Sequence, residues 1–380
     1  MIVITYLRWL LSELYVAAKS DNTMTINTPN SDQLQQIADD LRHHGHELGF
    51  QHIGITDIEL GEHQQHLQQW LANNFHGDMA FMAKHGDKRS HPEQLVPGTL
   101  RVISARLDYL PDNDQCLTVL EDPNKAYVSR YALGRDYHKL MRKRLASLAK
   151  KLQDSIGPFA YRALVDSAPV LERGLAEKAG LGWIGKNTML INSDAGSWFF
   201  LGEIYTDLPL PTDTPQNTMH CGSCTACLTD CPTGAIVAPH QVDARKCISY
   251  LTIELRDSIP EALRPLIGNR IYGCDDCQLA CPWNKFAKPT PEMDFQPRHN
   301  LDNAELLDLF DWTEEAFLKN TEGSAIRRIG YECWQRNITV ALGNAPRNEK
   351  IIDALKKRRN GSSPMVKEHI DWALQQQLNP

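Results

Sequence analysis

The chain has 380 residues, of which 42% are hydrophobic and 23% are charged, and its formal net charge is −7. This composition is that of an ordinary globular protein, and the length has room for roughly two or three domains. The negative net charge excludes a protein that coats nucleic acid without discrimination, but it leaves room for a local basic surface.

The N-terminal segment is unlike the rest of the chain. Residues 2–18 are apolar but are interrupted by Arg8 and Glu13, and no basic residue precedes them. Such a segment is a poor signal peptide and is too short and broken to span a membrane. Residues 19–33 are polar, so we expect residues 1–32 to form a disordered extension outside the folded body.

Hydrophobic periodicity predicts an α/β domain over residues 33–212. Amphipathic helices are predicted at 33–48, 62–73, 136–154 and 170–179, with Ser31 or Asp32 as the N-cap of the first. Strands are predicted at 50–57, 100–109, 161–165, 187–192 and 197–205. Alternation of helices and strands is typical of an α/β architecture.

The remainder of the chain divides into two regions. Prolines at 209, 211 and 215 mark a linker into a cysteine-rich domain over residues 213–290. From residue 291 to residue 380 the pattern is helical, with helices predicted at 303–311, 313–319, 324–342, 348–358 and 364–377. Their amphipathic pairs resemble a helical-repeat arrangement, although they are too few to establish a solenoid.

Charge is unevenly distributed along the chain. Residues 138–151 carry six Lys or Arg and no carboxylate, and residues 327–359 carry nine against three carboxylates. By contrast, residues 301–315 carry six carboxylates and no basic residue. Basic stretches on an acidic protein suit a discrete polyanion-binding surface, and a solvated helix face explains any one of them equally well.

Seven of the ten cysteines form two blocks, and an eighth, Cys247, lies alone between them. The first block, from Cys221 to Cys231, has the spacing C-x2-C-x2-C-x3-C-P, a bacterial ferredoxin pattern whose fourth cysteine ligates the other cluster. The second, from Cys274 to Cys281, lacks the first cysteine of that pattern, and Cys247 can replace it from a distance. Crossed pairing therefore assigns one 4Fe–4S cluster to Cys221, Cys224, Cys227 and Cys281, and the other to Cys231, Cys247, Cys274 and Cys277.

Other uses of these cysteines are weaker interpretations. Structural zinc also binds paired C-x2-C units, but zinc sites rarely need the additional C-x3-C-P arm on both. A disulfide framework does not suit a long chain whose cysteines are concentrated in one region. Cys116 and Cys333 stand outside the blocks and are expected not to bind iron. Oxygen-sensitive clusters imply a reducing compartment, so we expect the cytoplasm.

Two partial motif matches are rejected, one for the order of its flanking elements and one for a missing glycine. Residues 180–185 match the dinucleotide-binding string G-x-G-x-x-G, but a helix precedes them and strands follow, which inverts the required order. Their glycines are expected to cap a helix and to admit a ligand close to the backbone. Asp136 and His138 begin the string D-x-H-x-x-G, which supplies a lower histidine to some cobalamins, but Met141 occupies the glycine position.

Asp166 is the main candidate for acid catalysis. It follows the predicted strand 161–165, at a strand end where α/β sheets usually place reacting groups. Partial burial would raise its pKa and keep it able to donate a proton. The local sequence alone favours a simpler role, which is to cap the helix that begins near Pro169.

Five long motifs together resemble the epoxyqueuosine reductase family. They are VDSAPVLER at 165–173, AEKAGLGWIGKN at 176–187, GSWFFLGE at 196–203, DARKCISYLT at 243–252 and GNRIYGCDD at 268–276. The resemblance extends from about residue 33 to the end of the chain. It implies a cobalamin-binding α/β domain like that of reductive dehalogenases, a ferredoxin-like domain with two 4Fe–4S clusters, and a helical C-terminal region that is a candidate for tRNA binding.

The resemblance also implies a reaction. Members of the family reduce the cyclopentane epoxide of epoxyqueuosine, at the wobble position of tRNA, to the alkene of queuosine. Co(I) cobalamin, supplied with electrons through the two clusters, is the implied reductant. Asp166 aligns with the family's catalytic acid and is implied to protonate the leaving oxygen, which reverses the capping interpretation. The missing lower-histidine motif fits a corrin that has no protein ligand beneath its cobalt.

By motif position, the resemblance implies cobalamin contacts at Arg89, Ser129, Asp166, Lys186, Asn187, Leu190, Leu201, Ser249 and Asp275. It makes Arg327, Arg328 and residues 356–359 candidates for contact with the tRNA backbone, since phosphate neutralisation dominates such affinity. Trp183 and Tyr131 are candidates to stack on the target base. The implied partners are epoxyqueuosine-containing tRNA and a low-potential electron donor of the flavodoxin or ferredoxin type, with no membrane association and a monomeric chain.

Two other classes of function share parts of these features. A reductive dehalogenase-like corrinoid enzyme would act on a small molecule, and a simple electron-transfer protein would have no substrate of its own. The long α/β domain and Asp166 weigh against the electron-transfer protein. The basic helical C-terminal region weighs against an enzyme of small molecules, which would have little use for it.

Overall fold

A four-stranded sheet forms the centre of the N-terminal half. In the computed structural model, which describes residues 29–112, 115–216 and 219–378, the strand order is β1-β2-β7-β4 and every neighbouring pair is antiparallel. The strands are β1 (His52–Thr56), β2 (Arg101–Asp108), β4 (Tyr161–Leu164) and β7 (Phe199–Thr206). All four lie close to predicted strands, and the predicted α/β class is confirmed. The expected disorder of residues 1–32 falls, up to residue 28, outside the described residues.

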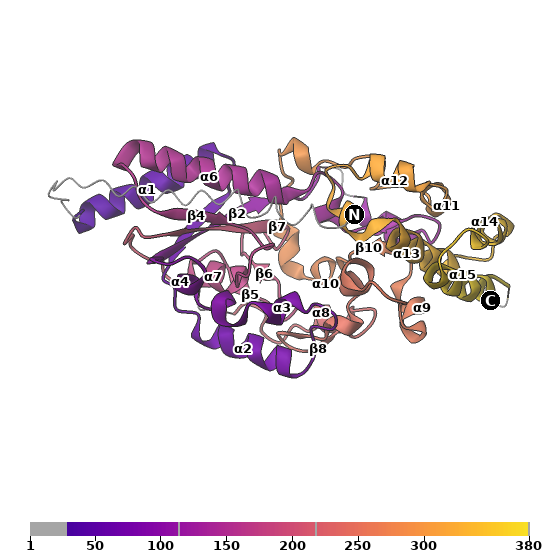
Figure 1. The fold of residues 1–380 in the computed structure, drawn as a ribbon. Helices are drawn as coiled ribbons and strands as arrows, with labels where there is room; N and C mark the ends of the chain where they lie inside the picture. The colour runs from indigo at the N-terminus through magenta and orange to yellow at the C-terminus, as the bar shows by residue number, and fades with distance from the viewer. Residues whose placement is uncertain (1–28, 113–114, 217–218, 379–380) are drawn as a thin grey trace, which may run out of the picture.

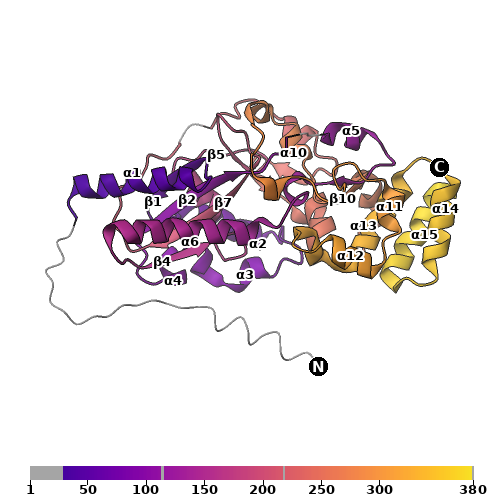
Figure 2. The ribbon, with the colours of Figure 1, turned by 90° about the horizontal axis from the view of Figure 1, so that it is seen from above.

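Helices cover both faces of this sheet. α1 (Ser31–Glu47) and α6 (Tyr137–Ile156) lie side by side on one face, and α7 (Glu172–Lys178) packs on the other (Figures 1 and 2). Side chains alternate along β7, so that Phe200 and Ile204 pack beneath α1 and α6 while Leu201 and Tyr205 pack on the opposite side.

The first helix begins one residue earlier than its predicted caps allow. Asn30 caps α1, and its side chain accepts a hydrogen bond from the backbone of Gln33, whose side chain accepts one from the backbone of Asn30. This reciprocal pair is a capping box. The prediction of Ser31 or Asp32 as the cap is therefore wrong, because Gln33 completes the box only with Asn30.

The other elements are shorter or lie in the C-terminal half. The short strands are β3 (Tyr127–Val128), β5 (Trp183–Ile184), β6 (Leu190–Ile191), β8 (Ile236–Ala238), β9 (Gln241–Val242) and β10 (Arg270–Tyr272). The earlier helices are α2 (Gly61–Ala72), α3 (Phe81–Lys84), α4 (Pro92–Leu95), α5 (Cys116–Glu121), α8 (Ala226–Thr229), α9 (Arg264–Ile267) and α10 (Asp276–Leu279). The C-terminal helices are α11 (Leu306–Phe310), α12 (Glu314–Asn320), α13 (Gly330–Asn344), α14 (Glu349–Arg359) and α15 (Pro364–Leu378), which confirm the predicted helical region. Within the described residues, no helix combines the length and apolar character that crossing a membrane requires.

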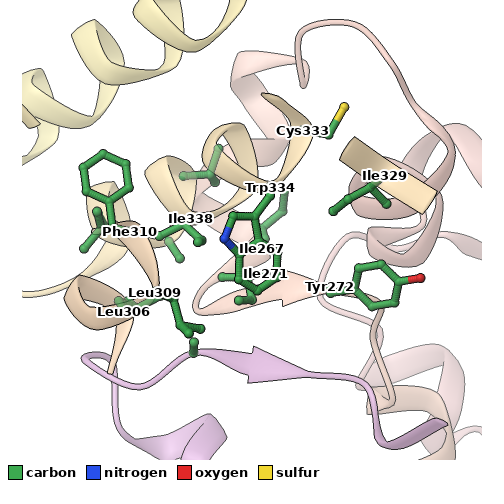
Figure 3. Close-up of a cluster of buried hydrophobic side chains, with 14 of the residues drawn as sticks. Ile267, Ile271, Tyr272, Leu306, Leu309, Phe310, Ile329, Cys333, Trp334 and Ile338 are labelled. Atoms are coloured by element: carbon green, nitrogen blue, oxygen red, sulfur yellow. The ribbon is translucent and has the colours of Figure 1, made fainter. Parts of the chain in front are cut away.

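The C-terminal helices share one hydrophobic core with segments from the middle of the chain. Trp334 and Ile338 of α13 lie among side chains from α9, β10 and α11, as Figure 3 shows. Residues within 126–133 and 244–272 belong to the same core. The cysteine-rich segment, which precedes residue 290, and the C-terminal helices, which follow it, therefore share a single hydrophobic core.

Two buried polar side chains of α13 fix this packing. Arg336 is 0% exposed and Asn337 is 1% exposed. The Arg336 guanidinium donates to three main-chain carbonyls, those of Leu251, Leu255 and Asp257. The Asn337 amide donates to the carbonyls of Thr252 and Ile271. Most of these acceptors lie in or beside the π-helical turn Tyr250–Glu254, a geometry that is rare and frequent at functional sites.

Replacing Arg336 by leucine is expected to destabilise the protein markedly. The substitution leaves three main-chain carbonyls without their donor, and each buried unsatisfied polar group costs about 1–3 kcal/mol. We expect the free energy of unfolding to fall by about 3 kcal/mol or more, as measured by urea denaturation. Arg347→Leu, at a side chain that is 55% exposed, is the control, and equal urea midpoints for the two variants would contradict this role of Arg336.

Candidate active site and cluster sites

A large cavity lies between the sheet and the cysteine-rich segment. Its volume is about 1460 Å³, which exceeds the roughly 300–1,000 Å³ of typical small-ligand pockets. Phe199, Phe200 and Leu201 of β7 line it, together with the first turn of α6 and the turn that follows β4. Such a cavity is large enough for a bulky cofactor together with part of a substrate.

The eight cysteines expected to bind iron fall into two sets of four, each lining a different cavity. Cys231, Cys247, Cys274 and Cys277 line it, and we name them the inner set. Cys221, Cys224, Cys227 and Cys281 line a separate cavity of about 290 Å³, and we name them the outer set. Crossed pairing predicts this same division. In the described part of the chain, Cys116 and Cys333 line neither cavity, and both are buried elsewhere.

Asp166 lies at the cavity wall, in the turn between β4 and α7. Since α7 begins at Glu172 with Leu171 at its N-cap position, the interpretation of Asp166 as the cap of this helix is wrong. The Asp166 side chain is 37% exposed because it faces the open cavity. One carboxylate oxygen accepts a hydrogen bond from the Tyr137 hydroxyl, and the other lies 2.9 Å from His138 Nε2.

The protonation state of Asp166 differs from the one expected from sequence. Burial raises its pKa, as expected, but the hydrogen bond and positive charge of His138 outweigh burial and hold the pKa below its usual range. Asp166 is therefore a carboxylate at neutral pH. The reason for its position also differs, because the sheet is antiparallel and has no common edge of carboxyl strand ends.

His138 lies between two carboxylates. Its Nδ1 is 2.5 Å from Asp136 Oδ1, and its Nε2 faces Asp166. Burial lowers the pKa of His138, but the hydrogen bonds to Asp136 and Asp166 raise it to about 9. The ring is an imidazolium at neutral pH with both nitrogens engaged, so it is not free to bind a metal. Its position far from Asp166 in sequence left no local signal for this pairing.

Two further carboxyl groups lie near Asp166. Glu203 of β7 is 0% exposed, and within the described chain neither of its carboxyl oxygens has a hydrogen-bond partner. Burial, reinforced by the charges of Glu172 and Asp166, raises the pKa of Glu203 well above its usual value. Burial and the charge of Asp166 raise the pKa of Glu172 to about 8. Both groups are protonated at neutral pH. Both lie within the motifs at 165–173 and 196–203, but the resemblance implied no role for either.

Eight of the nine residues for which the resemblance implies cobalamin contacts line the large cavity: Arg89, Ser129, Asp166, Asn187, Leu190, Leu201, Ser249 and Asp275. Lys186 lies elsewhere. It lines the outer-set cavity, and its Nζ donates to the carbonyls of Gly222 and Cys224 at 2.7 and 2.9 Å. Its amine therefore stabilises the loop that carries the outer set.

Asp275 joins two parts of the cavity wall. Its carboxylate is 2% exposed. It accepts hydrogen bonds from Tyr127 Oη, Ser129 Oγ and the backbone N–H of Arg130. Because Asp275 lies between Cys274 and Cys277, this contact fixes the inner set against the segment that carries Ser129.

The glycine-rich segment 180–185 is structural. Gly180 follows α7 with a φ of +77°, which confirms its helix-capping role. A side chain at Gly182 would collide with the backbone carbonyl of Ile191, so the close approach is to the protein rather than to a ligand.

Trp183 is 0% exposed and cannot stack on a substrate base, whereas Tyr131 lines the cavity.

Exposed basic side chains line the cavity, and we name them the basic rim: Arg135, Lys139, Lys143, Arg327 and Arg328. Arg135 pairs with Asp294, and Arg328 pairs with Glu254.

The other group expected to contact tRNA, residues 356–359, lies on α14 at the end of the molecule away from the sheet (Figure 1). There Arg358 donates to Tyr331 and Arg359 pairs with Asp371, which leaves Lys356 and Lys357 exposed.

Two four-cysteine sets beside a cavity with an acid–base pair define an iron–sulfur oxidoreductase. Comparison with known families agrees with this class. Residues 220–284 match the 4Fe-4S double cluster binding domain, and residues 89–167 match the model described as epoxyqueuosine reductase QueG, DUF1730.

Similar whole chains narrow the class further. Epoxyqueuosine reductases from Pseudomonas aeruginosa and Escherichia coli are 61% and 58% identical to this chain, over 89% and 91% of it and over 94% and 90% of their own lengths. The chain belongs to the epoxyqueuosine reductase family. This membership favours the tRNA-modifying reductase over the small-molecule enzyme and the electron carrier.

Solved structures of the family share the fold. Epoxyqueuosine reductase from Streptococcus thermophilus has a TM-score of 0.82 at 26% identity, covering 91% of both chains. One solved with a tRNA-Tyr epoxyqueuosine-modified stem loop has a TM-score of 0.80 at 28% identity, covering 90% of both chains. One from Bacillus subtilis, solved with the loop of its catalytic aspartate swung out of the active site, has a TM-score of 0.81 at 26% identity, covering 90% of this chain and 91% of its own.

Iron content tests the division of the cysteines. Cys247→Ser removes an inner-set ligand and is expected to lower the iron bound per chain by up to half, from about eight atoms toward four. Cys333→Ser, at a buried cysteine outside both sets, is the matched control and is expected to keep the full iron content. Iron lost from Cys333→Ser but kept by Cys247→Ser would overturn the assignment, as measured by colorimetric iron analysis after anaerobic purification.

Proposed function

We propose that the large cavity is the site at which the epoxide of epoxyqueuosine in tRNA is reduced to an alkene, with cobalamin as the redox cofactor and Asp166 as the group that protonates the leaving oxygen. One observation carries the proposal: a single cavity is lined by the inner cysteine set, by Asp166 and by the basic rim. An electron carrier has no need of Asp166, and an enzyme of small neutral molecules has no need of the rim.

The chemistry of the cavity wall suits a corrin. Leu190 and Leu201 offer apolar surface, and Ser249 offers a hydroxyl to the amide groups of the corrin edge. Arg89 is 6% exposed, and its buried Nε has no hydrogen-bond partner in the described part of the chain. A ligand oxygen at this point would satisfy that nitrogen, as buried polar groups require. When bound, cobalamin would supply a strongly reducing cobalt centre, whose electrons can cleave a C–O bond of the epoxide.

The protein supplies position, protons and exclusion of water. Asp166 faces the cavity and is held by Tyr137 and His138 on its two oxygens. Phe199 and Phe200 line the same space with apolar surface. In such surroundings, charge interactions with a developing oxyanion are stronger than in water.

The outer and inner sets would each hold a 4Fe–4S cluster, and the two clusters would supply electrons to the cavity. Cys224 of the outer set is exposed, whereas the inner set lines the cavity. A low-potential donor of the flavodoxin or ferredoxin type would therefore meet the outer cluster first. Oxygen-sensitive clusters favour a reducing compartment, so the proposal places the protein in the cytoplasm. The proposal also takes the working chain to be a monomer.

The tRNA reaches the protein through the basic rim. Lys139 and Lys143 project from α6 beside the cavity, and Arg327 lines it from the turn before α13. Phosphate neutralisation by such side chains supplies most of the affinity for a nucleic acid. Bases in an anticodon loop are unpaired, so the modified base can turn out of its stack into a pocket.

Asp166→Asn is expected to keep iron and bound cobalamin but to lower turnover by about 10²–10⁴-fold, because an amide cannot pass on a proton. Turnover is measured by mass analysis of nucleosides from epoxyqueuosine-containing tRNA, and cofactor content is measured by absorption. Asp154→Asn, at a carboxylate that is 66% exposed on α6, is the control and should retain turnover. Near-normal turnover in Asp166→Asn would return Asp166 to a structural role.

The combined variant Lys139→Gln, Lys143→Gln and Arg327→Gln is expected to bind tRNA more weakly and with less dependence on salt. Each lost phosphate contact lowers the slope of log K against log salt by about 0.7–0.9, so the slope should fall by about two units. Lys356→Gln with Lys357→Gln tests the α14 group separately. Lys150→Gln, paired with Asp154 farther along α6, is the control, and an unchanged slope in the combined variant removes the rim from the tRNA footprint.

A further inference from the structure

We infer that His138, held between Asp136 and Asp166, stores the proton used in the reaction, so that the acid is the His138–Asp166 pair rather than Asp166 alone. The inference rests on the proposed function and deepens it. His138 reaches the substrate through Asp166 and is therefore a positioning residue. Asp136 keeps its ring charged and oriented.

The overall reaction sets the demand for protons. Reduction of an epoxide to an alkene breaks both C–O bonds, consumes two electrons and two protons, and releases the oxygen as one molecule of water. The low-potential donor would supply the two electrons, by way of the clusters that the two cysteine sets would hold. One proton converts the epoxide oxygen to a hydroxyl as the ring opens, and the other lets that hydroxyl leave as water.

Asp166 by itself holds neither of these protons. Its pKa lies below its usual range, so the group is ionised at rest. The nearest transferable proton is on His138 Nε2, 2.9 Å from Asp166 Oδ1. A proton that moves along this contact makes Asp166 a carboxylic acid facing the cavity, ready to donate to a substrate oxygen.

The pair can be recharged between the two transfers. The His138 side chain is 27% exposed and that of Asp136 is 36% exposed, so solvent reaches this side of the pair. Asp136 accepts from Nδ1 and restores the preference of the ring for a second proton. One pair thereby serves both protonations of a turnover.

Tyr137 has a different role. Burial, together with the charge of Asp166, raises the pKa of the Tyr137 hydroxyl well above its usual value. The hydroxyl therefore keeps its proton and orients the carboxylate. Its ring stacks between His138 and Phe200, at centroid distances of 4.3 and 3.8 Å, which holds the imidazole in the plane that both carboxylates need.

The charged groups around His138 favour a protonated ring. The titratable and charged neighbours are Asp136, Tyr137 and Arg142 from α6 and its cap, Asp166 from the turn after β4, Glu172 from α7 and Glu203 from β7. Glu172 and Glu203 are neutral at pH 7, since burial raises the pKa of each. Arg142 is exposed and donates to the main-chain carbonyl of His138. The two ionised carboxylates therefore set the charge of the ring.

Asp136→Asn is the sharpest variant. Asparagine caps helices as well as aspartate does, so α6 keeps its first turn. The change removes one of the two negative charges beside His138, and we expect the ring to titrate near pH 7 instead of about 9. At pH 8 turnover should then fall about tenfold relative to the wild-type enzyme, while at pH 6 the two should differ by less than about twofold.

A second measurement needs no turnover. His138 is followed by NMR from pH 5 to pH 10 in the histidine-labelled holoenzyme with oxidised clusters, and its signal is assigned by its loss in His138→Gln. We expect titration near pH 9 in the wild-type enzyme and in the control Lys150→Gln, and near pH 7 in Asp136→Asn. His138→Gln should also lose about 10²-fold in turnover between pH 6 and pH 8, where the wild-type ring carries its proton.

The outcomes separate the two proposals. Titration of wild-type His138 near 6.5, its ordinary value, overturns the inference even if turnover is normal. An alkaline limb of the pH profile that stays in place in Asp136→Asn overturns it as well. A holoenzyme that reduces no epoxyqueuosine-containing tRNA at any pH defeats the proposed function, and the titration still decides whether His138 is the charged partner of Asp166.

Discussion

The cavity depends on the hydrogen bonds by which α13 fixes two segments, residues 251–257 and the strand β10. Three of the four cysteines of the inner set, Cys247, Cys274 and Cys277, come from two segments with little regular structure. Arg336 and Asn337 donate five hydrogen bonds to carbonyls in or next to these segments. A buried arginine costs much free energy to desolvate unless its donors are used. Its retention here is explained by the carbonyls that it satisfies, since the π-helical turn cannot satisfy them with a regular ladder.

The electrostatics of the cavity wall follow from burial and from one cation. Around Asp166, three further carboxyl groups gather, those of Asp136, Glu172 and Glu203. Were all of them ionised, their mutual repulsion would be severe in surroundings of low polarity. Burial keeps Glu172 and Glu203 protonated, and the imidazolium of His138 balances part of the charge on the other two. The group around Asp166 therefore carries less negative charge than four ionised carboxylates would.

Local sequence predicted the elements better than their contacts. The hydrophobic periods placed β2, α6 and the C-terminal helices closely, because each buries a continuous face. The cysteine spacing predicted the two sets of four, since this spacing reflects the geometry of a cluster. Long-range polar contacts left no such pattern. His138 was considered only within an incomplete motif, and the Lys186 amine, expected to contact cobalamin, donates to carbonyls of the outer-set loop. Neither the partner of a side chain nor its direction is encoded in neighbouring residues.

In the proposed function, protons and electrons reach the substrate from different parts of one cavity wall. The His138–Asp166 pair belongs to α6 and the turn after β4, while three of the four inner-set cysteines lie in or next to the segments held by α13. Asp275 links the inner-set segment to Ser129, eight residues before Tyr137 begins α6. With Asp275 fully engaged at 2% exposure, the two parts of the wall cannot separate without leaving a buried carboxylate unpaired, which is costly. The geometry between proton donor and electron donor is therefore set by the fold before any substrate arrives.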